Sequence, residues 1–232
     1  NYINVDEFMT NAASTDAKTS SESASGVVIV PPNFDFQINS TAKKLDFDEL
    51  KLENLKGNVA VNKGKLSLKN SGFDIVGANV KMDVNYASET SEKATFDMKV
   101  KANDFDVKRA YNEIKMFREM ATAAESAEGI ISLDYTVAGK LNSEMMPIYP
   151  SLSGGGKLSV RKVKMKGFKM FGAVSKKTGK DGIKNPDLSN VDITSKIKNN
   201  IITIDRFKFK VAGFRPRIEG TTSFDGKLNI KM

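Results

Sequence analysis

One internal repeat at a fixed spacing constrains this chain more than any other feature. An offset of 136 residues brings similar or identical residues together: Leu52 and Leu188, Asn54 and Asn190, Val61 and Ile197, Leu66 and Ile202, Phe73 and Phe209, Gly77 and Gly213. A duplicated supersecondary unit leaves such a pattern. Because many of the matched apolar residues stand at alternate positions, the repeat predicts a sheet built twice.

Apolar and polar residues alternate along most of the chain, as in antiparallel strands with one face in water. The clearest runs begin at Phe34, Val80, Ala94, Ile131 and Gly156. Turn signals stand between strands at Lys63-Gly64, Ser71-Gly72 and Gly77-Ala78. Their close spacing predicts a β-meander.

A helical pattern interrupts the strands once at length. Asp106 is a candidate N-cap, apolar residues follow at three- and four-residue spacing, and Gly129 marks a stop. Shorter helical segments are expected at 143–151 and 166–177. The expected fold class is α+β and mainly antiparallel β: a curved, duplicated β-meander like a groove, with one long and one or two short amphipathic helices packed on its apolar face.

Four parts follow from this organisation. Residues 1–28 hold the end of a strand and a polar linker, and 29–105 form the first β-repeat. Residues 106–129 form the amphipathic helix, and 130–232 form the second β-repeat with its short helices. The longest apolar run, Val27–Val30, is far too short to span a bilayer.

Composition excludes most catalytic chemistry. The chain has no Cys, His or Trp, so it cannot hold a Ser-His-Asp or Cys-His arrangement or a thiolate zinc site. The acid pair Asp104 and Asp106 would share a solvent face of a strand. Gly154-Gly155-Gly156-Lys157 lacks the remaining residues of a phosphate-binding loop and is interpreted as a flexible turn. No enzyme activity, cofactor or metal is expected.

The net charge of +8 comes mainly from lysines at alternate positions, such as Lys65, Lys69, Lys99 and Lys101. This pattern is typical of the solvent face of strands and not of a nucleic-acid surface. The densest basic stretch supplies candidate contacts to anionic lipid headgroups: Arg161, Lys162, Lys164, Lys166 and Lys169. The alternative is an ordinary solvated face.

The apolar face of the sheet is the stronger candidate for function. If the helices do not cover it, an apolar groove remains, and such a surface marks a ligand or partner site. The candidate lipid-facing residues are Phe36, Ile38, Phe96, Met98, Phe207 and Phe209. If the helices fill it, the face is an ordinary core.

Several segments resemble the C-terminal region of the AsmA family. They include Gly154-Gly155-Gly156-Lys157-Leu158, Asn185-Pro186-Asp187-Leu188 and the ending from Gly220 to Leu228, which fits G-x-[ST]-x-[FL]-D-G-x-[IL]. Val30-Pro31-Pro32-Asn33-Phe34 is similar to the version found in the Bacteroides group. The resemblance runs from about Ile29 to Met232.

This resemblance implies a periplasmic protein of the Gram-negative envelope, anchored to the inner membrane by a helix absent from this chain, with a role in outer-membrane biogenesis. It implies phospholipid or another acyl lipid as partner, carried along a β-sheet groove. The expected function is therefore non-enzymatic lipid binding or transfer. The alternative is a structural or protein-interaction module of the envelope with a filled core and no lipid.

Overall fold

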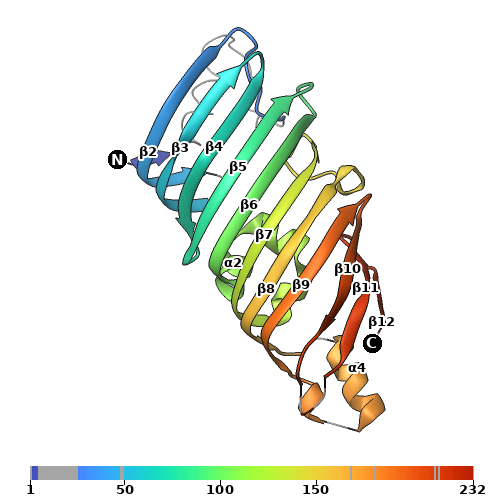
Figure 1. Ribbon diagram of the computed structural model, residues 1–232. Helices are drawn as coiled ribbons and strands as arrows, with labels where there is room; N and C mark the ends of the chain where they lie inside the picture. The colour runs from blue at the N-terminus through green and yellow to red at the C-terminus, as the bar shows by residue number, and fades with distance from the viewer. Residues whose placement is uncertain are drawn as a thin grey trace, which may run out of the picture. The chain divides into compact units, whose positions relative to one another are not determined.

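The computed structural model describes residues 2–4, 26–47, 50–167, 169–179, 181–211, 213 and 215–231. The protein is mostly antiparallel β-structure with few helices, which confirms the coarse fold class. The strands lie in the sheet in chain order, β1 to β12 (Figure 1). Most of the expected polar linker, at 5–25, lies outside the described residues.

The strands β2 to β6 are long and follow short turns. Their bounds, with that of β1, are β1 Tyr2–Asn4, β2 Asp35–Phe47, β3 Leu50–Asn62, β4 Lys65–Ile75, β5 Ala78–Ser88 and β6 Ala94–Asp106. The later strands are β7 Ala127–Leu141, β8 Ser153–Met165, β9 Asp187–Lys198, β10 Ile201–Lys208, β11 Arg217–Ser223 and β12 Leu228–Lys231. The pairs β2–β3, β3–β4 and β8 to β12 are antiparallel, whereas β1 pairs with β2 in parallel.

The chain divides into two compact units. The first comprises Asn1–Ile75, Asn79–Val100 and Ala138–Ile148, and the second comprises Val76–Ala78, Lys101–Val137 and Tyr149–Met232. The first contains β1 to β4 and most of β5, and the second contains the helices and β8 to β12.

The backbone repeats at the same offset as the sequence. In β3–β4, Val61 pairs with Leu66, and in β9–β10 Ile197 pairs with Ile202. The two-residue turns between these strands, Lys63-Gly64 and Asn199-Asn200, both have positive φ at each central residue, as type I′ hairpin turns require. Asn54 and Asn190 share a φ of 53°, and Gly77 and Gly213 have 83° and 82°. The two strand pairs therefore share pairing register and turn conformation at the offset of 136 residues.

The register extends the repeat to one more strand. Ala42 in β2 pairs with Leu55, and Val160 in β8 pairs with Val191. The strands β2 and β8 are therefore equivalent, at an offset of 118 residues, and each has 13 residues. The smaller offset arises because β2 turns directly into β3, whereas α4 (Lys169–Thr178) and the 3-10 turn η3 (Asp181–Ile183) stand between β8 and β9.

The expected single helix over 106–129 is wrong. Asp106 does cap a helix, accepting a hydrogen bond from the Arg109 N–H at 2.9 Å, but α2 ends at Glu113, α3 covers Lys115–Met120 and η1 covers Thr122–Ser126. The backbone is extended at Ile114, between α2 and α3. The three- and four-residue spacing shows only which residues face the core. A bend in the helix that keeps those residues facing the core leaves the spacing unchanged.

Two expected turns also lie inside strands. Ser71-Gly72 belongs to β4, where the register to β3 shifts; the turn signal marks a β-bulge. Gly154-Gly155-Gly156 belongs to β8. A Cβ on Gly154 would overlap the carbonyl oxygen of Thr136, and one on Gly156 would overlap that of Asp134. These glycines permit close approach of the neighbouring strand rather than a turn.

The short helices are found in part. The segment expected at 166–177 forms α4, whereas 143–151 contains only the 3-10 turn η2 (Tyr149–Ser151). In the second unit Phe171 of α4 packs edge-on against Phe209, with ring centroids 6.1 Å apart. Tyr149 stacks on Phe224 at 5.1 Å. These contacts show that helix and turn residues fill part of this unit's core.

The core of the first unit lies under residues 26–30, a segment that we call the strap. Val27 and Val30 join a buried cluster with Val61, Tyr86 and Leu141. The Tyr86 hydroxyl donates to the Val28 carbonyl at 2.7 Å, and the Val27 N–H donates to the Ser91 carbonyl at 2.9 Å. Burial raises the pKa of Tyr86. The strap is thus held by both apolar and polar contacts.

We predict that Gly156→Ala destabilises the protein by about 1–3 kcal/mol, as overpacking a close contact does. Its Cβ would lie 2.6 Å from Cγ of Tyr135. Gly172→Ala in α4 is the control. Among the described residues, no atom outside its own stretch of helix lies within 4 Å of its Cβ, and a helix gains about 0.5–1 kcal/mol from the exchange. Urea unfolding measures both; equal effects would contradict the close approach at Gly156.

We also predict that Tyr86→Phe lowers the free energy of unfolding by about 1 kcal/mol at pH 7, because the Val28 carbonyl loses its partner. Since the folded-state pKa of Tyr86 is raised, ionisation of the unfolded chain lowers wild-type stability as pH rises above the ordinary value of 10.0. The phenylalanine variant lacks this loss. The difference in free energy of unfolding between the two proteins should therefore shrink above pH 10 in denaturant titrations. A difference that grows would refute the prediction.

Candidate functional site

The candidate site is the apolar face of the first unit. Directly opposite residues of antiparallel strands share a face, and two apolar rows cross β2, β3 and β4 in this way. The rows are Phe36–Val61–Leu66 and Ile38–Val59–Leu68. The alternation that the sequence shows is therefore assembled into one continuous apolar surface.

The reverse face is polar and internally hydrogen-bonded. The Ser67 hydroxyl and the Asn85 side chain lie 3.0 Å apart, and the Asn85 amide donates to the Asp97 carboxylate at 2.8 Å. This row links β4, β5 and β6. It fixes which face turns to water, because a one-residue slip would bury all three polar side chains.

The strap covers only part of the apolar face. Val61 is 7% exposed beneath it, in the middle of one row, whereas Phe36 is 39% and Ile38 is 51% exposed at the β2 ends of the two rows. Val59 and Leu68 are half-buried. Ile29 and Phe34 add further exposed apolar surface close by in the chain, at 54% and 56%. The uncovered part of the rows therefore lies toward β2.

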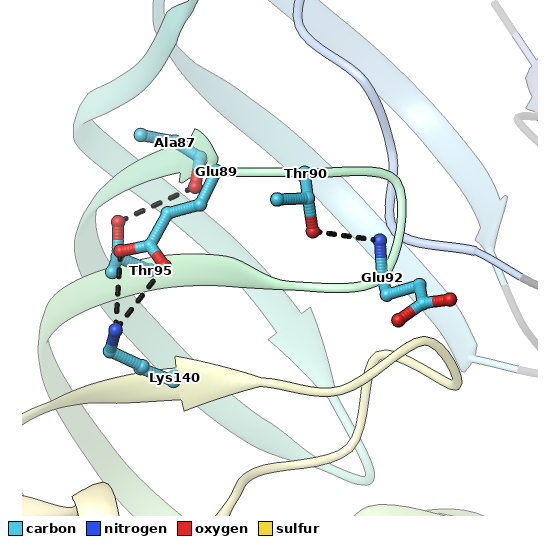
Figure 2. A network of polar contacts seen from close by, with 6 residues as sticks. All are labelled: Ala87, Glu89, Thr90, Glu92, Thr95 and Lys140. Carbon is cyan, nitrogen blue, oxygen red and sulfur yellow. Dashed lines mark hydrogen bonds and ion pairs between the residues drawn. The ribbon is translucent and has the colours of Figure 1, made fainter.

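Polar contacts position the strap at the turn between β5 and β6. Lys140 of β7 forms an ion pair with Glu89 at 3.2 Å, and the Thr95 hydroxyl donates to the Ala87 carbonyl (Figure 2). The Val30 N–H donates to the Ser88 hydroxyl at 3.2 Å at the start of this turn. The strap is thus bonded at one end of the apolar surface, to a turn that has polar contacts of its own.

Two more of the predicted lipid-facing residues belong to this face. Phe96 of β6 packs against the cluster under the strap, and Met98 lies two residues along the same strand and so on the same side. Both are half-buried. Phe36, Ile38, Phe96 and Met98 therefore all contribute to the apolar surface of the first unit.

The other two predicted residues lie in the second unit and are less available. Phe207 is half-buried, and Phe209 is only 5% exposed. Their rings lie 6.0 Å apart, and Phe209 also contacts Phe171. Phe209 is therefore part of the core beneath α4 and is not an open lipid contact.

Two of the basic candidates are paired with carboxylates. Arg161 lies 3.9 Å from Asp104, and Lys166 forms an ion pair with Glu128 at 2.9 Å, which lowers the pKa of Glu128. Lys162 and Lys164 lie on β8, between these two residues in the sequence. Both are exposed and have no ion pair among the described residues. The side chain of Lys169 lies outside the description.

A polar hollow of about 570 Å³ lies in the second unit. Its lining combines Lys210 and Arg215 with the carboxylate of Asp187 and with Asn185. Val211 is its main apolar contact. The mixed charge and sparse apolar lining make it a poorer match to an acyl chain than the rows of the first unit.

Sequence reasoning missed the strap and one aromatic contact. Tyr135 of β7 lies against Gly156, and its hydroxyl lies 2.9 Å from that of Ser195, which is 4% exposed. The ring fills the space that a side chain at Gly156 would occupy. The signal that could have indicated this contact is that Gly154 and Gly156 stand where the first copy has Phe36 and Ile38. This equivalence becomes apparent only when the strand register is known.

Within the described ranges, no group of acidic side chains is arranged to hold a metal ion. No helix in that part of the chain is both long and apolar enough to cross a membrane. The geometry therefore offers an apolar face as its main feature. Comparison with family models, curated proteins and solved structures found no match.

Proposed function

We propose that this chain is a non-enzymatic lipid-binding segment whose sheet presents an apolar face to acyl chains. The single observation that carries the proposal is the pair of apolar rows across β2, β3 and β4, with Ile38 51% exposed at the end of one row. An uncovered surface of this kind marks a binding site more often than a defect.

The chemistry of the face favours hydrocarbon over a polar ligand. Phe36, Ile38, Val59 and Leu68 offer no hydrogen-bonding side chain. Burial of hydrocarbon contributes about 0.8 kcal/mol per CH₂, so contact with several methylenes provides affinity without a directional group. Such a site would accept acyl chains of varied length.

In this proposal the strands form a curved, groove-like meander, and the amphipathic helices cover part of its apolar face. The exposed Lys162 and Lys164 of β8 would meet anionic headgroups, each contributing about 1 kcal/mol near a charged membrane surface. The protein would act in the periplasm as an AsmA-like segment in outer-membrane biogenesis, with phospholipid as its partner. Support for this setting is the resemblance of the sequence alone.

The second unit favours the alternative, a structural or interaction module with a filled core. Phe209 is buried against Phe171 of α4, and Val211 and Ile218 are also buried. A face filled in this way presents little apolar surface to hydrocarbon. The two readings therefore apply to different parts of the chain, and the lipid proposal rests on the first unit.

We predict that Ile38→Asp weakens binding of a fluorescent fatty acid about tenfold or more, since burying an isoleucine side chain is worth about 1.5–3 kcal/mol. Asn39→Asp is the matched control, because it adds the same charge on the opposite face of β2 and both positions are exposed. Titration of the purified chain measures the affinities. Extraction and mass spectrometry of the same protein should detect bound phospholipid.

A chain that carries no lipid after purification and binds the probe equally in both variants would refute the lipid proposal. Circular dichroism of each variant controls for folding. Because Ile38 is half exposed, its substitution leaves the core intact.

A further inference from the structure

Among the residues that the structure describes, the outer edge of β2 is open over nine residues. The strand β1 pairs only with Lys44, Leu45 and Asp46, and among the described residues nothing pairs with the outer edge from Asp35 to Lys43. An edge of this length presents unpaired backbone N–H and C=O groups to any extended strand. It is bounded on one side by β1 and on the other by the start of β2, just after Pro31 and Pro32.

The internal repeat shows what such an edge accepts. The equivalent strand β8 has β7 as its neighbour on the corresponding side. Contacts there join Gly154 to Thr136 and Gly156 to Asp134, so position numbers rise along one strand as they fall along the other. The pairing is antiparallel, and an antiparallel strand is therefore the natural occupant of the β2 edge.

The side chains at this edge differ from those of β8 in size. Phe36 and Ile38 stand where β8 has Gly154 and Gly156, and Tyr135 of β7 uses the space above Gly156. A strand that pairs with β2 must therefore carry small residues opposite Phe36 and Ile38. Its ends must also suit the charges of Asp35 and Lys43.

The sequence of β2 satisfies these requirements for itself. We propose that two copies of this chain associate through this edge, β2 against β2 in antiparallel pairing centred on Asn39. In that register Phe36 lies opposite Ala42, and Ile38 lies opposite Ser40. Asp35 lies opposite Lys43 at both ends, which gives two cross-strand pairs of opposite charge.

The two-fold symmetry follows from the same geometry. The open stretch runs from 35 to 43, so its middle residue is Asn39, and pairing about this residue uses every open backbone group of both copies. A symmetric dimer of this kind is closed, because each edge is consumed by the other. The apolar rows of the two copies would continue on one face, since directly opposite residues share a side.

Cysteine cross-linking of the full chain tests the register, because the protein has no cysteine of its own. Asn39→Cys should form a disulfide-linked dimer under mild oxidation, since residues directly opposite in antiparallel strands lie about 4.5–5.5 Å apart between Cα atoms, within disulfide reach. Thr41→Cys alone should not cross-link, because its opposite residue is Gln37. A mixture of Gln37→Cys and Thr41→Cys should link the two different chains.

Charge reversal gives an independent measurement. Asp35→Lys should raise the dimer dissociation constant about tenfold in analytical ultracentrifugation, because like charges then face each other at both ends. Lys43→Asp should do the same, and the double exchange should restore wild-type association. Lys65→Asp is the control on β4, away from the edge.

A wild-type chain that stays monomeric at all concentrations, with no Asn39→Cys cross-link, overturns the proposal and leaves the edge to a strand of another protein. Equal cross-linking of Asn39→Cys and Thr41→Cys also overturns it, because it shows contact without this register. All these substitutions lie at exposed positions, so folding is expected to be retained.

Discussion

The structure depends on the register in which each strand pairs with the next. Val61 opposite Leu66 and Ile197 opposite Ile202 bring one apolar side chain against another, and the same register places Ser67 beside Asn85 on the reverse face. A shift of one residue would exchange the two faces. Two-residue turns with positive φ at Lys63-Gly64 and Asn199-Asn200 hold this register in both copies.

The two copies share the same register but differ in the side chains that one strand carries. In the first, Phe36 and Ile38 enlarge the apolar face at an open edge. In the second, Gly154 and Gly156 stand at the equivalent positions, and the neighbouring strand with Tyr135 approaches them closely. Duplication thus preserved the backbone pairing, whereas the side chains at one strand decided whether the face stays open or is filled. The proposed lipid contact and the proposed self-association both follow from the open version.

Strands were predictable from alternation because a period of two residues is specific to them. Turns were predictable where glycine or asparagine takes positive φ between strands, as at Gly64 and Gly77. The same residue types misled at Gly72, Gly129 and Gly154, which lie within strands. Glycine occurs where a neighbouring strand approaches closely as well as at turns. A single sequence does not show which strand is the neighbour. The prediction of one long helix failed for a similar reason. The backbone bends at Ile114, yet Val107, Ala110 and Ala124 stay buried, so the helical spacing does not reveal the bend.

The sequence by itself determined the repeat, the alternating faces and the absence of imidazole and thiol chemistry, because each is a property of residue type and spacing. It predicted Phe36, Ile38, Phe96 and Met98 as lipid-facing residues, and these four lie on the apolar side of the first unit. Only the tertiary structure decided how far each is covered. The strap at 26–30 lies over Val61, and α4 buries Phe209, whereas Ile38 remains exposed. Burial depends on which segment, distant in the sequence, packs on a residue. The local sequence pattern does not indicate that segment.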